Sequence, residues 1–356
     1  MNHSVENAVD RKGIVMNGYQ RILYYGKKAL LFLLSLLFLS VFVFYLSRLA
    51  PGDPLMSYYG DRVEKMSSLQ RERAEEKLGL HDPIYVQYIR WLERAVHGDF
   101  GISYKYKTDV TAVIGERIFH TLLLGGTGFV LIFLLAPCLG VLCAFRENGL
   151  TDRVLCKTGT IMSCIPEFWL ALLFILLFSV QLQWLPAGGA YTVGGKQDLS
   201  DRLLHLALPL MVVVASHLWY YAYMIRNLVL EEVRADYVLF ARSKGLHKTR
   251  ILFCHCLWNV IPSYLSLMAV SVPHILGGTY MVELVFSYPG LGMLSYESAR
   301  YKDYNLLMLL SILSAAVVMV CSMAAQVIDE RLEPGMRAEQ RTEKWKRRAG
   351  GGSECV

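Results

Sequence analysis

Six long stretches without a charged residue constrain the fold of this chain more than any other feature. Each holds at least about 18 mostly apolar residues, the length that an α-helix needs to cross a hydrocarbon layer roughly 30 Å thick. The stretches are 29–47, 118–145, 168–195, 203–225, 251–282 and 304–328. Backbone polar groups in lipid must be hydrogen-bonded within the chain, so each stretch predicts a helix. We expect an all-α polytopic membrane protein with six transmembrane helices.

Two details refine this prediction. The third helix should begin earlier, near Leu155, with Glu167 interrupting it. The first stretch begins after 28 residues and exceeds the 7–15 residues of a signal-peptide core, so we expect it to be retained. The composition is 54% hydrophobic and 19% charged, whereas soluble proteins carry about 25% charged residues. An ordinary cytoplasmic enzyme and a disordered chain are therefore excluded.

Lysine and arginine set the expected orientation. The short connection 226–256 carries six of them, against two in each of 184–203 and 283–305. By the positive-inside rule, both termini are cytoplasmic. The net charge of +6 then reflects topology and contact with the lipid bilayer, and we predict no nucleic-acid partner. The expected parts are a cytoplasmic segment 1–28, a first transmembrane helix 29–49, an extracytoplasmic helical cap 50–117, a five-helix transmembrane core 118–330 with a cytoplasmic loop 226–250, and a cytoplasmic basic tail 331–356.

The cap is too long for a simple connection, and it has helical patterns of its own. A stripe of apolar residues between Val63 and Leu78 predicts one amphipathic helix. Asp82 and Pro83 then predict an N-cap and a first helical position, followed by a second apolar stripe up to Val96. Two helices on the outer rim would suit either a docking surface for a partner or a lid over a pore.

The cytoplasmic loop contains a short amphipathic segment, 236–245. Tyr237, Phe240 and Ala241 fall on one side of a helix, and Gly245 is a typical C-terminal residue. Such a helix could bury its apolar side in a groove of a partner protein or rest on the bilayer surface. The pattern alone leaves both readings open.

The sequence lacks the motifs of several catalytic classes. It has no phosphate-binding P-loop, no zinc-protease motif and no nucleophile elbow, so we expect neither an enzyme nor a bound cofactor. Energy for uphill transport must then come from an ion gradient or from a partner. Glu167, beside Pro166, is the one acid well inside a predicted span, and it is a candidate for the translocation path. The alternative is a structural role, as a cap of a neighbouring helix or of the break at Pro166.

A series of short motifs, in order along roughly 21–337, resembles the inner-membrane permeases of the dipeptide, oligopeptide and nickel class of ATP-binding-cassette (ABC) importers. The motifs are LAPGDP at 49–54, LGLHDP at 78–83, GDFGIS at 98–103, IPEFW at 165–169, WLP at 184–186, DYVLFARSKGL at 236–246, FSYPGLG at 286–292 and EPGMR at 333–337. Each motif alone is weak, but their order is specific. The tail beyond Arg337 has no counterpart in this resemblance.

The resemblance implies a type I importer permease fold in the bacterial inner membrane. It implies four kinds of partner: a second homologous permease, two ATP-binding subunits, an extracytoplasmic solute-binding protein that meets the cap, and the lipid bilayer. The block 236–246 corresponds to the coupling loop of the family, which docks into the ATPase. The residues that would make this contact are Asp236, Tyr237, Phe240, Ala241, Arg242, Lys244 and Gly245.

The block departs from the general Glu-Ala-Ala pattern of the family, because Leu239, Phe240 and Ala241 occupy those places. Arg242 and Lys244 are then the candidates for a polar anchor of the loop. For the cargo, the family implies peptides first and nickel or a metal chelate second. The remaining alternatives are an ion-coupled secondary carrier, which would need no ATPase, and a membrane receptor, which would transport nothing.

Overall fold

A computed structural model describes residues 18–49, 54–77, 79–192, 194 and 198–332 of the chain. These residues form helices and connecting turns without a β-strand, apart from one isolated bridge between Ile102 and Asp109. Most of the basic tail, the first 17 residues and the motif at 333–337 lie outside the described residues, as do residues 50–53 of the cap.

The helices follow one another along the chain, and short 3₁₀ or π segments adjoin several of them. They are α2 (Gly18–Leu49), α3 (Pro54–Tyr59), the 3₁₀ helix η1 (Gly60–Lys65), α4 (Ser68–Lys77), α5 (Ile84–Val96), α6 (Val110–Phe145), α7 (Leu150–Cys164), α8 (Glu167–Phe174), the π-helix η2 (Ile175–Gln181), α9 (Leu199–Val233), α10 (Asp236–Ser243), α11 (Lys248–Ile251), the π-helix η3 (Leu252–Cys256), α12 (Leu257–Val285), α13 (Leu291–Arg300) and α14 (Tyr304–Leu332).

Five helical segments are long and apolar enough to cross a membrane, and a sixth is counted when a bent pair is taken as one span. The bent pair is α7 followed by α8 and η2, with an angle of 99° at the break. Ile165 is extended there, as a residue before proline prefers to be, and Pro166 precedes the first residue of α8. The predicted all-α, multi-pass fold is confirmed, including the interruption at Glu167.

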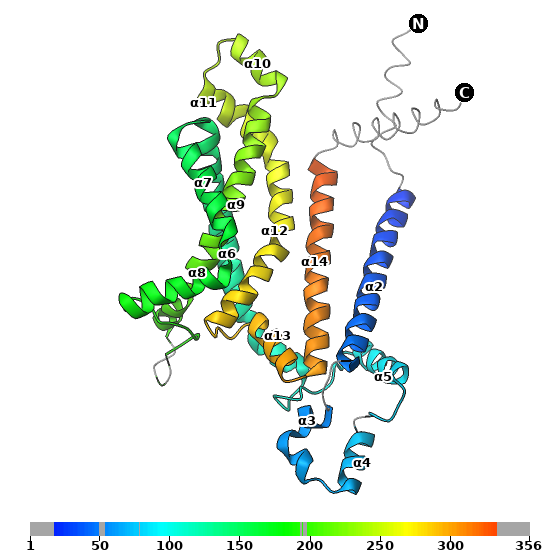
Figure 1. Ribbon diagram of the computed structural model, residues 1–356. Coiled ribbons are helices and arrows are strands. Elements are labelled where there is room, and N and C mark those ends of the chain that lie inside the picture. Colours follow the sequence, from blue (N-terminus) through cyan, green and yellow to red (C-terminus); the bar gives the residue numbers. More distant parts are fainter. Residues whose placement is uncertain (1–17, 50–53, 78, 193, 195–197, 333–356) are drawn as a thin grey trace, which may run out of the picture.

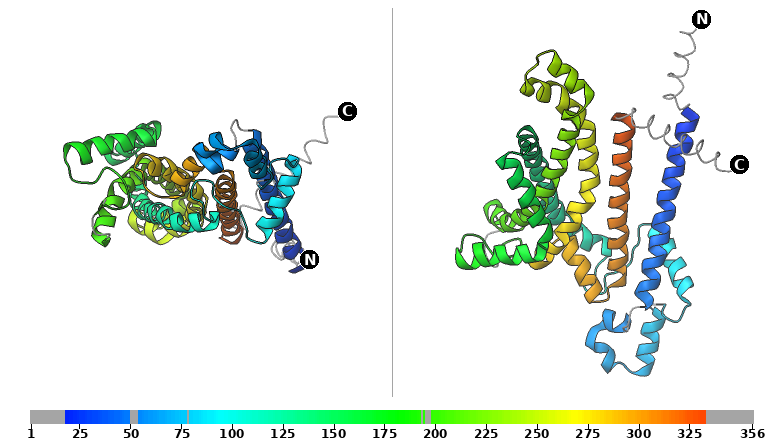
Figure 2. Two further views of the ribbon diagram at one scale, coloured as in Figure 1. Left: turned by 90° about the horizontal axis from the view of Figure 1, so that it is seen from below. Right: turned by 45° about the horizontal axis from the view of Figure 1, so that its top comes forward.

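The spans form two groups (Figure 1). Helices α6, α7, α9 and α12 pack together, and α14 lies between α12 and α2. The helices of the cap, α3, α4 and α5, lie at one end of the spans, and α10 and α11 lie at the opposite end, where α2 begins (Figures 1 and 2). The structure therefore separates the cap from the loop 226–250 by the full length of the spans.

Close backbone contact holds α6 to α9. A Cβ atom at Gly140 would lie 2.8 Å from the carbonyl oxygen of Ala222, so only glycine allows this approach. Pro137, three residues earlier in α6, has no N–H to donate to the carbonyl of Phe133. The Tyr264 hydroxyl of α12 donates a 2.6 Å hydrogen bond to that carbonyl instead. A proline inside a span is thus satisfied by a neighbouring helix.

The cap begins differently from the sequence prediction. The first expected helix is divided into η1 and α4, in which Val63 and Ala74 are buried together. Asp82 does not cap α5, which begins at Ile84 after Pro83, because the Asp82 carboxylate forms an ion pair with Arg90. Helix α5 itself lies against the end of α2 and α14. Phe44, Tyr88 and Met308 form the buried contact, and a 2.8 Å hydrogen bond joins the hydroxyls of Ser40 and Tyr88.

Candidate functional site

Helix α10 is the short segment that the sequence analysis assigned to partner docking. It follows α9 after two residues, Arg234 and Ala235, and a turn at Gly245 ends it. Two hydrogen bonds close that end: the Gly245 N–H donates to the Arg242 carbonyl (2.9 Å), and the Leu246 N–H donates to the Ala241 carbonyl (3.3 Å). This pair of bonds is a Schellman motif, and Gly245 has the left-handed φ of +78° that it requires.

The buried side of α10 differs in one residue from the predicted one. Val238 (2% exposed) and Ala241 pack on the core, with Tyr237 beside them. Leu239 is 71% exposed and Phe240 is 62% exposed, so Phe240 does not belong to the buried side. The reason is geometric: with about 3.6 residues per turn, Phe240 lies at the edge between the side that holds Tyr237, Val238 and Ala241 and the side that holds Leu239. The exposed pair is an apolar contact surface on the solvent side of the loop.

Within the described part of the chain, Tyr237 is the residue that holds α10 by a polar contact. Its hydroxyl donates a 2.6 Å hydrogen bond to Glu232 Oε2 near the end of α9, and the Asn259 amide of α12 donates to the same oxygen at 3.3 Å. Burial and this bond to Glu232 raise the pKa of Tyr237, which keeps the phenol protonated. Arg242 and Lys244, the anchors considered from sequence, are both exposed, and Lys244 Nζ lies 4.3 Å from the centre of the Phe240 ring. Tyr237 thus ties α10 to the end of α9, and the shared Glu232 carboxylate links this contact to α12.

Glu167 lies at the first position of α8, directly after the break. Its side chain is 24% exposed, and Oε1 lies 3.5 Å from Nε2 of the buried His217 on α9. Gly278 of α12 makes room for both groups, because a Cβ there would lie 2.6 Å from the His217 ring and 2.9 Å from Glu167 Oε1. Three helices therefore meet at one carboxylate.

Further polar side chains surround this carboxylate. The His217 ring lies 5.1 Å from the His274 ring, and a 3.0 Å hydrogen bond joins His274 Nδ1 and the Tyr221 hydroxyl. The sequence analysis singled out Glu167 but could not pair it with residues 50 and 107 positions away. In the described part of the chain, no three His, Cys, Asp or Glu side chains are arranged to hold a metal. The cluster can exchange hydrogen bonds with a polar group that reaches the exposed part of Glu167.

One buried ion pair was missed by the sequence analysis. Asp152 of α7, 2% exposed, accepts hydrogen bonds from both Nε and Nη2 of Arg226 on α9, and from the backbone N–H of Asn148. Asp152 lies in the first turn of α7. Both residues flank uncharged stretches, but nothing in their spacing pairs them.

A second buried carboxylate organises the end of α12. Glu283, fully buried in α12, accepts a 2.7 Å hydrogen bond from the Thr121 hydroxyl and a 2.6 Å bond from the Gly292 N–H. A Cβ at Gly290 would lie 2.3 Å from this carboxylate. The glycines of the motif at 286–292 are thus required by the close approach of the loop to Glu283.

Two family models match the chain. The "Binding-protein-dependent transport system inner membrane component" model matches residues 136–338, and the corresponding N-terminal model matches residues 23–125. The oligopeptide transport system permease AppB of Bacillus subtilis is 34% identical over 87% of this chain and 98% of its own length. The metal-staphylopine import system permease CntB of Staphylococcus aureus is 30% identical over 74% of this chain and 81% of its own length. A solved structure of the methionine ABC transporter MetNI in inward-facing form has a TM-score of 0.49 at 18% identity and covers 62% of this chain and 97% of its own.

The first family model alone spans more than half of the chain, and the second spans the cap and the first helix. Together they account for both groups of spans. The chain is a multi-pass membrane protein and a transport component, and it belongs to the family of inner-membrane permeases of binding-protein-dependent ABC importers.

Proposed function

We propose that this permease forms half of the translocation path of an ATP-driven importer for peptides. The similarity to the permease AppB, named for oligopeptide transport, carries the choice of cargo, because it extends over nearly the full length of both chains. In this proposal the assembly holds a second homologous permease and two ATP-binding subunits. An extracytoplasmic binding protein delivers the peptide.

The proposed orientation places both termini and α10 in the cytoplasm and the cap outside. The distribution of lysine and arginine supports it, and so does the position of α10 at the end of the spans where α2 begins. The parts of the chain are then the five-helix core 118–330, the cap 50–117, the first helix 29–49 and cytoplasmic segments at 1–28 and 331–356.

The surface of α10 would meet the ATPase through Leu239 and Phe240, flanked by Asp236, Arg242 and Lys244. Exposed apolar side chains at the tip of a loop are costly in water and favour burial in a groove. Tyr237 and Ala241 would join this surface to the core, and Gly245 would allow the sharp return of the chain. When ATP closes the two ATPases, α10 moves with them, and its contacts with α9 and α12 carry the motion into the spans.

A metal chelate is the second candidate cargo. The observation that favours it is the similarity to CntB, whose name states metal-staphylopine import. Peptides remain the first candidate cargo, because the similarity to AppB is greater in identity and in length than the similarity to CntB.

Purification and reconstitution test this function. A tagged chain, purified in mild detergent from its own cells, should retain a second permease and ATP-binding subunits. Proteoliposomes of that assembly, with the co-expressed binding protein, should take up labelled tri- to pentapeptides only when ATP is present. Uptake of a nickel chelate but not of peptides would contradict the peptide assignment. A chain that is isolated alone and transports with an ion gradient would contradict the importer.

Replacing Glu167 with glutamine should lower peptide uptake about tenfold or more. In this proposal the carboxylate lines the path and forms a charge-assisted hydrogen bond with the passing cargo, and such bonds contribute roughly 1.5–3 kcal/mol. Initial uptake rates in proteoliposomes measure the effect. The matched control is Glu116→Gln, at an exposed position of α6, which should not change the rate. Unchanged uptake in Glu167→Gln with normal expression would remove Glu167 from the path.

A further inference from the structure

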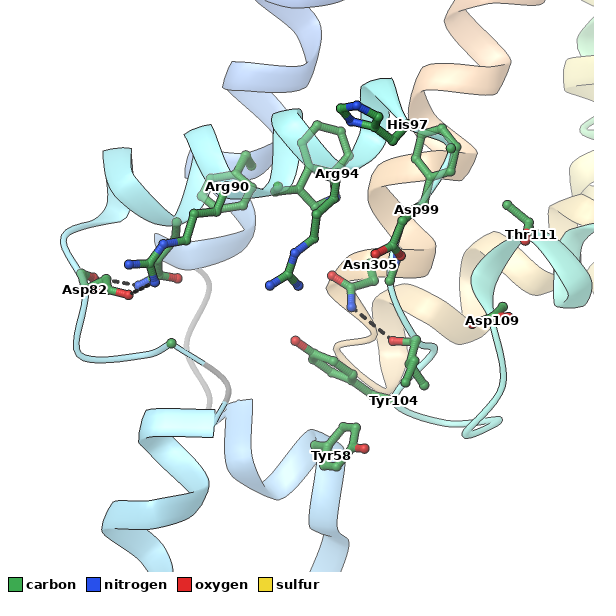
Figure 3. A pocket seen from close by; sticks show the side chains of 18 of the residues that line it. Tyr58, Asp82, Arg90, Arg94, His97, Asp99, Tyr104, Asp109, Thr111 and Asn305 are labelled. Atoms are coloured by element: carbon green, nitrogen blue, oxygen red, sulfur yellow. Dashed lines mark hydrogen bonds and ion pairs between the residues drawn. The ribbon is translucent and has the colours of Figure 1, made fainter.

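The cap borders a cavity of about 930 Å³, and the Asp82–Arg90 ion pair lies in its lining. Its walls come from α5, the ends of α2 and α14, the start of α6, single residues of α3 and α4, and the connections 79–83 and 97–109 (Figure 3). This is within the size range of sites that bind small ligands, which is about 300–1,000 Å³. The cavity lies at the end of the spans opposite α10, away from the helices that carry the Glu167 cluster.

Charges of both signs line this cavity, and several lack an ion-pair partner. Arg90 is used by Asp82. Arg94, one helical turn later, extends its guanidinium into the cavity between the Asp82 and Asp99 carboxylates (Figure 3). Within the described ranges, no ion pair is formed by Arg94, by Asp99 or by Asp109, another acid of the lining. Asp99 accepts a 2.9 Å hydrogen bond from the N–H of Gly101.

Several buried polar atoms of the lining have no hydrogen-bond partner among the residues that the structure describes. They are Nε and Nη1 of Arg48, Oε1 of Gln87 and Nε1 of Trp91, all on residues that line the cavity. The Arg48 guanidinium contacts aromatic rings, with Phe44 at 5.2 Å and Tyr304 at 5.6 Å from the ring centres. A buried polar group left unpaired costs roughly 1–3 kcal/mol, and native structures contain few of them. Their concentration at one cavity is typical of a wall that a ligand covers.

The remaining wall is aromatic. Tyr58 and Tyr104 meet edge to face with ring centres 5.5 Å apart, and Figure 3 places both below the Arg94 guanidinium. Trp91 and Phe100 lie 6.5 Å apart on the α5 side. Aromatic faces accept apolar and aromatic side chains without demanding one shape, which suits a ligand whose side chains vary. The cavity therefore combines fixed charges with aromatic walls that can accept side chains of different shapes.

We propose that this cavity is a peptide-binding site on the permease itself, with the C-terminal carboxylate of a short peptide at Arg94 and its N-terminal ammonium at Asp99. Asp109 adds negative charge on the side of Asp99 (Figure 3), and Arg48 is a further positive charge in the lining. The identity of the ligand as a peptide rests on the proposed function. A lipid phosphate fits less well, since a purely anionic group would leave Asp99 and Asp109 uncompensated. A zwitterion satisfies both signs.

Binding of trialanine to the full assembly, without its binding protein, tests this site. The assembly is held in lipid nanodiscs, and isothermal titration measures the dissociation constant. Amidation of the peptide C-terminus should weaken binding to the wild type about tenfold or more, because it removes the charged partner of Arg94. Arg94→Gln should weaken trialanine binding by a similar factor and should no longer distinguish trialanine from trialaninamide. The control Arg73→Gln, on α4 outside the cavity, should bind both peptides as the wild type does.

Three outcomes would overturn the site. They are no trialanine binding to the wild type, equal binding of the amide, and full discrimination retained in Arg94→Gln. Weaker docking of the binding protein to Arg94→Gln, with peptide binding unchanged, would instead assign the cavity to protein docking. ATP-driven peptide uptake with the binding protein, measured on the same assembly, separates the two proposals. Uptake without cavity binding rejects the site alone, and cavity binding without uptake rejects the cargo assignment alone.

Discussion

Uptake will be lost when Gly245 is replaced by aspartate, although the chain will still insert in the membrane. Gly245 adopts φ +78° at the end of α10, where an L-residue costs roughly 1–2 kcal/mol. A Cβ at this position meets no atom of the chain within 4 Å, so the fold tolerates the side chain sterically. The new carboxylate instead lies on the surface of α10 that we propose docks into a groove of the ATPase. There it would be buried without a partner. ATP-dependent peptide uptake and retention of the ATPase during purification measure the effect.

Two further variants isolate the cause. Gly60→Asp introduces the same residue at φ +61°, also with nothing within 4 Å, but in the cap. It should carry the same backbone strain and leave ATPase retention unchanged. Gly245→Asn keeps the preference for left-handed backbone without the charge, so it should retain part of the uptake. Normal uptake by Gly245→Asp, or an equal loss of ATPase in Gly60→Asp, would contradict the assignment of α10 to docking.

The spans could be predicted from sequence because lipid excludes charge so strictly. Six uncharged stretches were enough to place α2, α6, α9, α12 and α14, and Pro166 with Glu167 marked the break before α8. The same was true of the turn at Gly245, since a left-handed residue at a helix end strongly favours glycine. Each of these features depends on residues that are close together in the sequence, so the sequence alone is enough to predict it.

Contacts between distant helices could not be predicted in this way. The sequence does not show that Glu167 and His217 are neighbours. Only the packing of α8, α9 and α12 around Gly278 brings Glu167 Oε1 to 3.5 Å from His217 Nε2. For Asp82, the local pattern predicted the wrong role. Its position before a proline fits an N-cap, but in the folded cap its carboxylate pairs with Arg90. The cavity beside α5 is of the same kind, because its walls come from parts of the chain as far apart as Phe44 and Asn305.

Removing the Asp152 carboxylate should cause the largest loss of stability among single substitutions in the loop region. Asp152 is 2% exposed, and the Arg226 side chain is 13% exposed, so Asp152→Ala leaves a buried guanidinium without its carboxylate. Breaking a buried pair in this way costs about 3–5 kcal/mol. The backbone N–H of Asn148 also loses its acceptor. We expect the melting temperature of the purified assembly in detergent to fall by about 5–10 °C.

A neighbouring ion pair provides the control, because it joins nearly the same elements at the surface. Arg234 at the end of α9 pairs with Glu147, next to the end of α6, but their side chains are 67% and 35% exposed. Glu147→Ala should therefore cost less than about 1 kcal/mol and shift the melting temperature little. The double variant Asp152→Leu with Arg226→Leu should recover most of the loss, since it removes both charges and fills the space. Equal shifts of the melting temperature for Asp152→Ala and Glu147→Ala would show that burial does not set the strength of the Asp152–Arg226 pair. The contact between α7 and α9 would then depend on apolar packing alone.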